Sequence, residues 1–348
     1  MLSAESSFVR ERYRVWSLTC RDASARRARW HDEHVVQPTQ PNPDLVNALA
    51  HARTVAEDHM IRADHAGNSW REETISELLW LHAQPFVMCA DFTRHEESMV
   101  GADWLWWWVD DSGECFGMLV QAKRLHHRDG RPELNFRHND GQQMKRLFRA
   151  AELFKVPATY ALYFGGIEFR DGLTCGDDEH TSACERCRRA SVSVITALQA
   201  ELASLGSLRD AATLAFSTSV PLEDFVHPDP AAGVVRDLNL RLVEPGLREF
   251  LVQEQTGVRQ VARELFRVIS ADRMMQFSMD VAEHVDTAAD TVFLDLPLDT
   301  GHFSTPYFPH ILRGLRTRPP AYVQDVLTGQ RPPPAVTEKV GGIVVVRC

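Results

Sequence analysis

Three polar residues interrupt two strongly apolar segments in the first half of this 348-residue chain. Asp103 precedes the aromatic run at residues 104–109, and Gln121 and Lys123 end the apolar run that begins at Phe116. Burying a charge costs free energy unless the charge is paired or bound to a metal. The residue types therefore indicate either a metal-dependent site or a plain ion pair between Asp103 and Lys123 at the ends of two strands.

The turn between the two runs decides whether the three side chains meet. Gln121 and Lys123 are two positions apart, so in a strand they project from the same face. A three-residue turn that ends at Gly113 places Asp103 directly opposite Gln121. A two-residue turn places Asp103 opposite Ala122, on the other face of the sheet. A common site is therefore expected only with the odd-length turn or with a bulge.

Apolar periodicity predicts the elements that position these residues. A helix should begin near Asn42, which can cap it, with Pro43 at its first position. The expected helices cover residues 43–60, 70–81, 142–154, 190–205 and 247–268, and the expected strands cover residues 86–92, 101–109, 116–123, 158–164 and 341–346. The order helix, strand, strand, strand, helix, strand over residues 70–164 is that of an α/β core.

These motifs resemble the PD-(D/E)XK, or restriction-endonuclease-like, superfamily, in which an Asp on one strand is followed by (D/E/Q)-x-K on the next. Gly101-x-Asp103 and Gln121-Ala122-Lys123 match the variant with Gln at the acidic position, which is similar to Mrr-type nucleases. The sequence motifs Gly-Ala-Asp-Trp and Gln-Ala-Lys-Arg-Leu also resemble those of a family of uncharacterised bacterial proteins. The resemblance implies a helix, a three-stranded meander, a helix and a strand.

The resemblance also implies an activity. Such a protein is a Mg²⁺-dependent or Mn²⁺-dependent endonuclease that hydrolyses phosphodiester bonds, with DNA favoured over RNA, in bacterial defence against phage or other foreign DNA. Asp103 would bind the metal and Gln121 would offer one neutral oxygen, which suits a hard cation that keeps several waters. Lys123 would orient the attacking water or offset charge on the phosphate. Relatives that cut both strands often work as homodimers.

A neutral Gln121 makes a second carboxylate valuable. Glu73 and Glu77 share one face of the helix before the hairpin, and the resemblance favours Glu73. Glu97, or the glutamate before it, is the alternative. Gln143, on the helix after the hairpin, is similar to a glutamine that several relatives place beside the site.

Charge is distributed unevenly along the chain. The net charge of −10 is unfavourable for general nucleic-acid binding. Residues 121–150, however, contain eight Lys and Arg residues against three acidic ones. Lys145, Arg146 and Arg149 are candidates for phosphate contacts. The alternative to a nuclease is a catalytically inactive nucleic-acid-binding or interaction module that keeps the fold.

The aromatic run contains four tryptophans. Strand alternation places Trp104, Trp106 and Trp108 on the face away from Asp103, where core packing is favoured over base stacking. Trp107 lies on the same face as Asp103.

A second cluster consists of Cys175, His180, Cys184 and Cys187. Their types make them candidate ligands of a structural zinc ion, with unligated cysteines as the alternative. A site filled by these four ligands has no open position, so catalysis there is not expected.

The chain is divided by these patterns into three parts. Residues 1–66 form a helical N-terminal segment, residues 67–168 the nuclease-like core, and residues 169–348 an α+β C-terminal extension with the zinc insertion at 175–187. The sequence begins without the basic and apolar pattern of a secretory signal and lacks about 18 consecutive apolar residues, so a cytoplasmic protein with no membrane association is expected.

Overall fold

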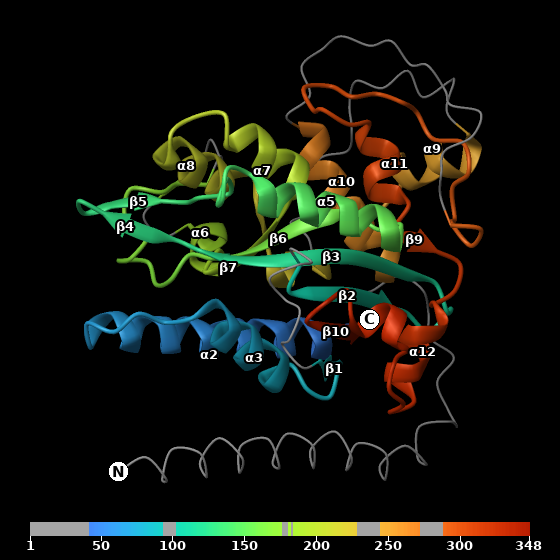
Figure 1. Cartoon of the computed structure of the whole chain (residues 1–348), viewed down its shortest axis with the longest axis horizontal. Helices are drawn as coiled ribbons and strands as arrows, with labels where there is room; N and C mark the ends of the chain where they lie inside the picture. The colour runs from blue at the N-terminus through green and yellow to red at the C-terminus, as the bar shows by residue number, and fades with distance from the viewer. Residues whose placement is uncertain (1–41, 93–101, 176–179, 182–183, 228–243, 272–287) are drawn as a thin grey trace.

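A mixed β-sheet runs through the computed structural model, which describes residues 42–92, 102–175, 180–181, 184–227, 244–271 and 288–348 (Figure 1). The strand order is β1-β10-β2-β3-β6-β7-β8, and β9 pairs with β3. The strands of this sheet are β1 (Val87–Asp91), β2 (Trp104–Val109), β3 (Cys115–Arg124), β6 (Ala158–Tyr163), β7 (Val192–Thr196), β8 (Val220–Pro221), β9 (Leu315–Arg316) and β10 (Gly342–Arg347). A separate hairpin of β4 (His126–Arg128) and β5 (Arg131–Glu133) follows β3.

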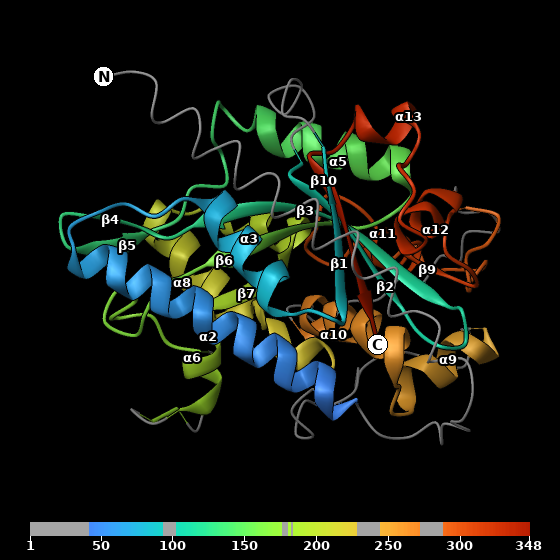
Figure 2. The ribbon, with the colours of Figure 1, turned by 90° about the horizontal axis from the view of Figure 1, so that it is seen from below.

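Helices cover both faces of the sheet (Figures 1 and 2). They are α2 (Pro43–His65), α3 (Glu72–His82), α5 (Gln142–Phe154), α6 (Glu185–Arg189), α7 (Ala197–Ala203), α8 (Leu208–Thr218), η2 (Leu222–Phe225), α9 (Pro245–Val252), α10 (Gly257–Ala271), α11 (Tyr307–Leu312), α12 (Ala321–Leu327) and α13 (Pro334–Thr337). One apolar cluster joins a sheet face to α2, α3, α10 and α11. The other joins the opposite face to α5, α7, α8 and α12. The α/β class expected from the sequence is confirmed.

Local signals placed the first helices correctly. The side chain of Asn42 caps α2 by accepting hydrogen bonds from the backbone N–H groups of Asp44 and Leu45, and Pro43 occupies the first turn. The residues buried on α2 are the five that recur at helical spacing, Leu45, Leu49, Ala52, Ala56 and Met60. Helices α3 and α5 and strands β1 and β6 also lie within about two residues of their expected bounds, which is the usual uncertainty of helix ends.

The expected three-stranded meander is interrupted. Strand β10, from the end of the chain, lies between β1 and β2, antiparallel to the first and parallel to the second. Residues 343–346 of β10 are all buried, and a strand covered on both faces is typically a continuous apolar run. Residues 169–348 therefore complete the central sheet through β7, β8, β9 and β10, and they are not an appendage to a core that ends at residue 168.

The predicted bounds of two helices in the C-terminal half are wrong. Residues 192–196 form strand β7, because Val, Ile and Thr favour a pleated surface. The helix of this region begins only after Thr196, whose side chain caps it. The long helix expected at 247–268 is two helices, because α9 ends at Val252 and α10 begins at Gly257, where φ is +56°.

In the part of the chain that the structure describes, no helix combines the length and apolar character needed to cross a membrane. The helical prediction for residues 1–41 lies outside the described residues.

Because β10 lies in the middle of the sheet, a cavity at its buried residues should lower the free energy of unfolding. Ile343 is fully buried and pairs with Leu105 of β2. Ile343→Ala should lower the free energy of unfolding by about 2–5 kcal/mol, because it leaves a cavity in the middle of the sheet. Leu153→Ala, at a position that is 60 % exposed on α5, should change it by less than about 0.5 kcal/mol. Urea denaturation measures both variants, and equal effects would contradict a central role for β10.

Candidate active site

The hairpin of β2 and β3 has the register that the site requires. Trp104 pairs with Val120, so the next pair outward brings Asp103 opposite Gln121. The connecting turn has three residues, because the backbone N–H of Asp110 donates to Glu114 O at 3.2 Å and Gly113 adopts a φ of +86°. The turn therefore has the odd length that a common site requires.

The carboxylate of Asp103 is directed at the backbone of β3. The N–H of Asp103 donates to Val120 O at 3.1 Å, which extends the ladder beyond the end of β2. Its Oδ2 accepts a hydrogen bond of 2.7 Å from the N–H of Ala122. The half-buried Asp103 is therefore held beside the residue that separates Gln121 from Lys123.

Gln121 offers a buried oxygen. Only 3 % of the residue is exposed, and its Oε1 has no hydrogen-bond partner among the residues that the structure describes. Its neighbour in the register is Tyr160 of β6, which is also buried. A buried acceptor without a partner costs about 1–3 kcal/mol, so Oε1 lies where a donor or a cation would be stabilising.

Lys123 is held by a residue of the next helix. Its Nζ donates to Gln143 Oε1 at 2.8 Å, and both residues are partly buried. Gln143 is the second residue of α5, which begins after Gly141 in the left-handed conformation. The structure thus brings together the lysine and the glutamine that the sequence predicted.

Among the described residues, a glutamate that contacts the end of β3 is Glu72, which the sequence did not single out. Its Oε1 accepts a hydrogen bond of 2.8 Å from the N–H of Arg124 at the end of β3. Burial raises the pKa of Glu72, and the charge of Lys123 opposes that rise. Glu73 and Glu77 are exposed on α3, and no contact with the end of β3 is found for them in the described part of the chain.

The position of Glu72 on α3 explains its orientation. Ile75, Ser76 and Leu79 form the buried face of the helix, and Glu72 precedes them by three, four and seven positions. It therefore lies on the same face, whereas Glu73 lies beside it. Glu97, the glutamate before it and Gly101 lie outside the described residues.

Arg124 belongs to the other side of β3. It donates to the backbone oxygen of Trp70 and lies over the ring of Trp70 at 5.5 Å from the centroid. It therefore supports the connection before α3. The other Lys and Arg residues between positions 121 and 150 are exposed: Arg128, Arg131, Arg137, Lys145, Arg146 and Arg149. They lie on the β4–β5 hairpin, on the following loop and on α5 (Figure 1).

The tryptophans are core residues, as expected. Trp106 and Trp108 belong to one apolar cluster and Trp107 to the other, and all three are at most 1 % exposed. Trp107 packs so closely on β3 that a Cβ at Gly117 would lie 2.6 Å from its ring. It is unavailable for stacking on a base.

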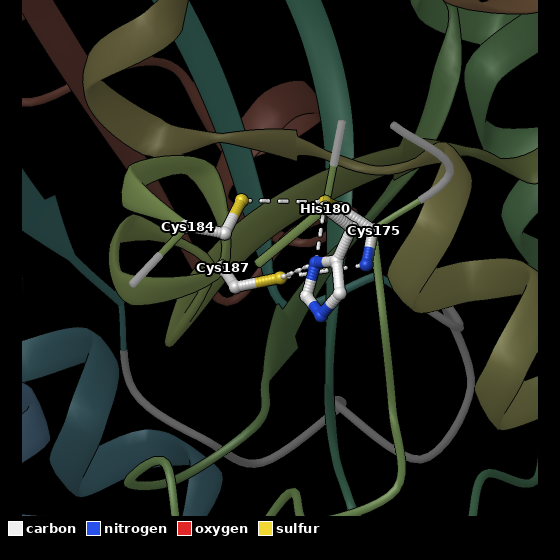
Figure 3. A group of neighbouring side chains, drawn as sticks. All are labelled: Cys175, His180, Cys184 and Cys187. Atoms are coloured by element: carbon white, nitrogen blue, oxygen red, sulfur yellow. Dashed lines mark hydrogen bonds between the residues drawn. The ribbon is translucent and has the colours of Figure 1, made fainter. Parts of the chain in front are cut away.

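The four candidate zinc ligands also come together. The ligand atoms of Cys175, His180, Cys184 and Cys187 all lie within 4.8 Å of one another (Figure 3). This is the only group of three or more His, Cys, Asp or Glu residues with metal-binding proximity in the described part of the chain.

Fold and site together define an α/β protein in which a central hairpin carries a carboxylate, an amide and an amine. The chain belongs to the family of unknown function DUF6615, whose model matches residues 45–347. No curated protein matches the chain, and no solved structure matches it. The matched range runs from α2 to β10 and includes every site residue described above.

The half-buried Glu72 predicts a pH dependence of stability. Its pKa is raised by burial above the ordinary value of 4.5, so its contribution to stability is fully present below about pH 4.5 and is lost as the pH rises through the folded pKa. Glu72→Gln removes this loss, because the amide oxygen can still accept from Arg124. The variant should gain stability relative to the unmodified protein as the pH rises above about 4.5, and it should keep that advantage above the folded pKa.

Urea denaturation at several pH values, with a chelator present, measures this difference. Glu73→Gln is the matched control, since Glu73 is exposed and should follow the unmodified protein throughout. A Glu72→Gln curve parallel to that of the unmodified protein would show that Glu72 does not titrate abnormally.

Proposed function

We propose that this protein is a metal-dependent endonuclease of the PD-(D/E)XK, or restriction-endonuclease-like, type, and that DNA is its substrate. The observation that carries the proposal is the meeting of Asp103, Gln121 and Lys123 on one face at the ends of two paired strands. The elements that follow support it, since α5 connects β3 to the parallel strand β6. Hairpin, helix and parallel strand is the order expected of such a core.

The donor set fits a hard cation. Asp103 provides a carboxylate and Gln121 a buried amide oxygen without a partner among the described residues. Mg²⁺ prefers oxygen ligands and usually retains several waters, so few protein ligands suffice. Asp103 and Gln121 would hold the ion, with Glu72 as the nearest additional acid. When bound, Mg²⁺ or Mn²⁺ polarises the scissile phosphate and lowers the pKa of a coordinated water.

Lys123 supplies the positive charge of the site. A lysine ammonium has three donors, and Gln143 accepts from one of them. This bond orients the amine, so the other donors can address a phosphate oxygen or the attacking water. In hydrolysis a bond forms between water oxygen and phosphorus, the bond to the leaving oxygen breaks, and the leaving oxygen gains a proton. A fixed ammonium beside the phosphate offsets the charge that develops there.

The exposed basic residues provide a surface for the nucleic-acid backbone. Lys145 and Arg149 lie on α5, the helix that also carries Gln143. Arg128 and Arg131 face each other across the turn of the β4–β5 hairpin. Exposed basic side chains on α5 and on the β4–β5 hairpin suit contacts with a nucleic-acid backbone, despite the net charge of −10.

A second candidate function is favoured by one observation. Gln121 is neutral at a position where most relatives of the proposed type have an acid, and three acidic or histidine ligands do not gather there among the described residues. The protein would then be an inactive nucleic-acid-binding or interaction module. A role in defence against foreign DNA, and a homodimer that presents one centre to each strand, are further parts of the main proposal.

Substitutions at the hairpin should separate the two candidates. With plasmid DNA and Mg²⁺ or Mn²⁺, Asp103→Asn and Lys123→Gln should each lower the cleavage rate about 100-fold or more, because each removes one charged group from the site. Gln121→Glu should keep or raise the rate, since it restores a carboxylate. Single-stranded DNA and RNA tested in parallel define the substrate, and light scattering defines the oligomeric state.

Two variants serve as controls. Asp111→Asn changes an exposed carboxylate in the turn at the far end of the same hairpin, and Arg248→Gln changes an exposed cation on α9. Both should cleave at the original rate. Cleavage unaffected by Asp103→Asn would refute the assigned site, and DNA binding without metal-stimulated cleavage would identify the inactive module.

The basic surface predicts the salt dependence of DNA binding. Each phosphate contact contributes about 0.9 to the slope of log K against log salt concentration for duplex DNA. Lys145→Gln combined with Arg149→Gln should therefore reduce the slope by roughly two. Fluorescence anisotropy with Ca²⁺ in place of Mg²⁺ measures it, and Arg248→Gln with Arg318→Gln is the control pair. An unchanged slope in the α5 variant would remove this helix from the DNA-binding surface.

A further inference from the structure

The side chains of Cys175, His180, Cys184 and Cys187 form a compact cluster, in which the ligand atoms lie close together. Cys175 Sγ lies 3.4 Å from His180 Nδ1 and 3.5 Å from Cys184 Sγ. Cys187 Sγ lies 3.6 Å from the same ring nitrogen. The side chains converge on one point from the segment before α6 and from α6 itself (Figure 3).

These three distances are close to the edges of a zinc tetrahedron, and the ligand atoms all lie within 4.8 Å of one another. Zinc binds sulfur at about 2.3 Å and nitrogen at about 2.0–2.1 Å, so neighbouring ligands are separated by about 3.8 Å for two sulfurs and about 3.6 Å for sulfur and nitrogen. A disulfide requires about 2.05 Å between sulfurs, and Cys175, Cys184 and Cys187 form no disulfide here. In addition, the backbone N–H of Cys175 donates to Cys187 Sγ at 3.4 Å, an arrangement that stabilises a thiolate.

We propose that Cys175, His180, Cys184 and Cys187 bind one Zn²⁺ ion, which has a structural role. Three sulfurs and one imidazole are a ligand set that zinc occupies in closed, four-coordinate sites. No ligand position remains for water or substrate. The ion stabilises the connection between β6 and β7 and takes no part in phosphodiester hydrolysis, so the proposal is independent of the nuclease activity.

Helix α6, in the connection between β6 and β7, has only five residues and contributes no buried residue to the core. Helices of this length are unstable in isolation. The N-cap of α6 is Cys184, whose side chain makes no capping hydrogen bond, and Cys187 lies one turn further on. Zinc would therefore fix the first turn of α6 through two of its ligands.

Once α6 is fixed, its arginines reach the rest of the protein. Arg189 forms an ion pair of 3.0 Å with Asp224 of η2. Arg186 donates to the backbone oxygen of Ser217, at the end of α8, at 3.2 Å. These contacts join the cluster to the edge of the sheet at β8.

A buried arginine continues this link to α2. Arg170 is 3 % exposed and donates to the backbone oxygens of Gly165 and Arg188 at 3.0 and 3.2 Å. It also pairs with Glu57 of α2 at 3.4 Å. A buried ion pair is stabilising only where its geometry is held and its hydrogen bonds are complete. The carbonyl of Arg188 has that position only while α6 is in place.

Metal analysis of the purified protein tests the proposal. The chain is expressed without a histidine tag, purified without chelator and analysed by plasma mass spectrometry, and it should contain about one zinc per chain. Cys184→Ser and Cys187→Ser should each lose most of that zinc. Cys89→Ser, at a half-buried cysteine on β1 outside the cluster, should keep it. Zinc well below one per chain after incubation with Zn²⁺, or equal zinc in Cys184→Ser, would overturn the proposal.

A second measurement covers variants that fail to fold. Replacing zinc by Co²⁺ in the unmodified protein should produce the visible absorption bands of tetrahedral cobalt thiolate, whereas an octahedral spectrum would overturn the ligand set. A disulfide between Cys175 and Cys184, found by peptide mass mapping of the zinc-treated protein, would also overturn it. Removal of zinc with a chelator should lower the melting temperature of the unmodified protein but not that of Cys184→Ser.

Discussion

The register of the β2–β3 hairpin is the constraint on which the candidate site depends. Because side chains alternate between faces, a slip of one residue would separate Asp103 from Gln121 and Lys123. It would also exchange the two apolar faces of β2, which pack against different sets of helices. The three-residue turn holds one end of the hairpin, and the bond from Ala122 to Asp103 holds the other. Asp103 therefore helps to hold the register that places it opposite Gln121.

Much of this arrangement could be predicted because its causes are local. The cap at Asn42, the apolar stripe of α2 and the turn at Gly113 act within a few residues. The role of Glu72 could also have been predicted from the sequence, since helical periodicity places it on the same helix face as Ile75, Ser76 and Leu79. The choice of Glu73 followed a family resemblance, and the periodicity of this helix is the better guide to which carboxylate is buried.

Other features had no local signal. The apolar run of β10 indicates a strand, but nothing in it indicates pairing with β1 and β2, which lie more than 200 positions earlier in the sequence. The predicted meander failed for this reason. Strand β7 was hidden because apolar residues recur along the whole of residues 190–205. A short buried strand followed by a helix then has much the same composition as one buried helix.

The two proposed metal sites differ in ways that keep their ions apart. The hairpin offers a carboxylate and an amide oxygen, which suit Mg²⁺ or Mn²⁺. The cysteine cluster offers three soft sulfurs and a nitrogen, which select zinc and exclude hard cations. Zinc generally binds mixed sites more tightly than Mn²⁺, so a protein with only the hairpin site would be exposed to inhibition by zinc. The two proposed sites therefore differ in donor chemistry, with oxygen donors at the hairpin and sulfur and nitrogen donors in the cluster.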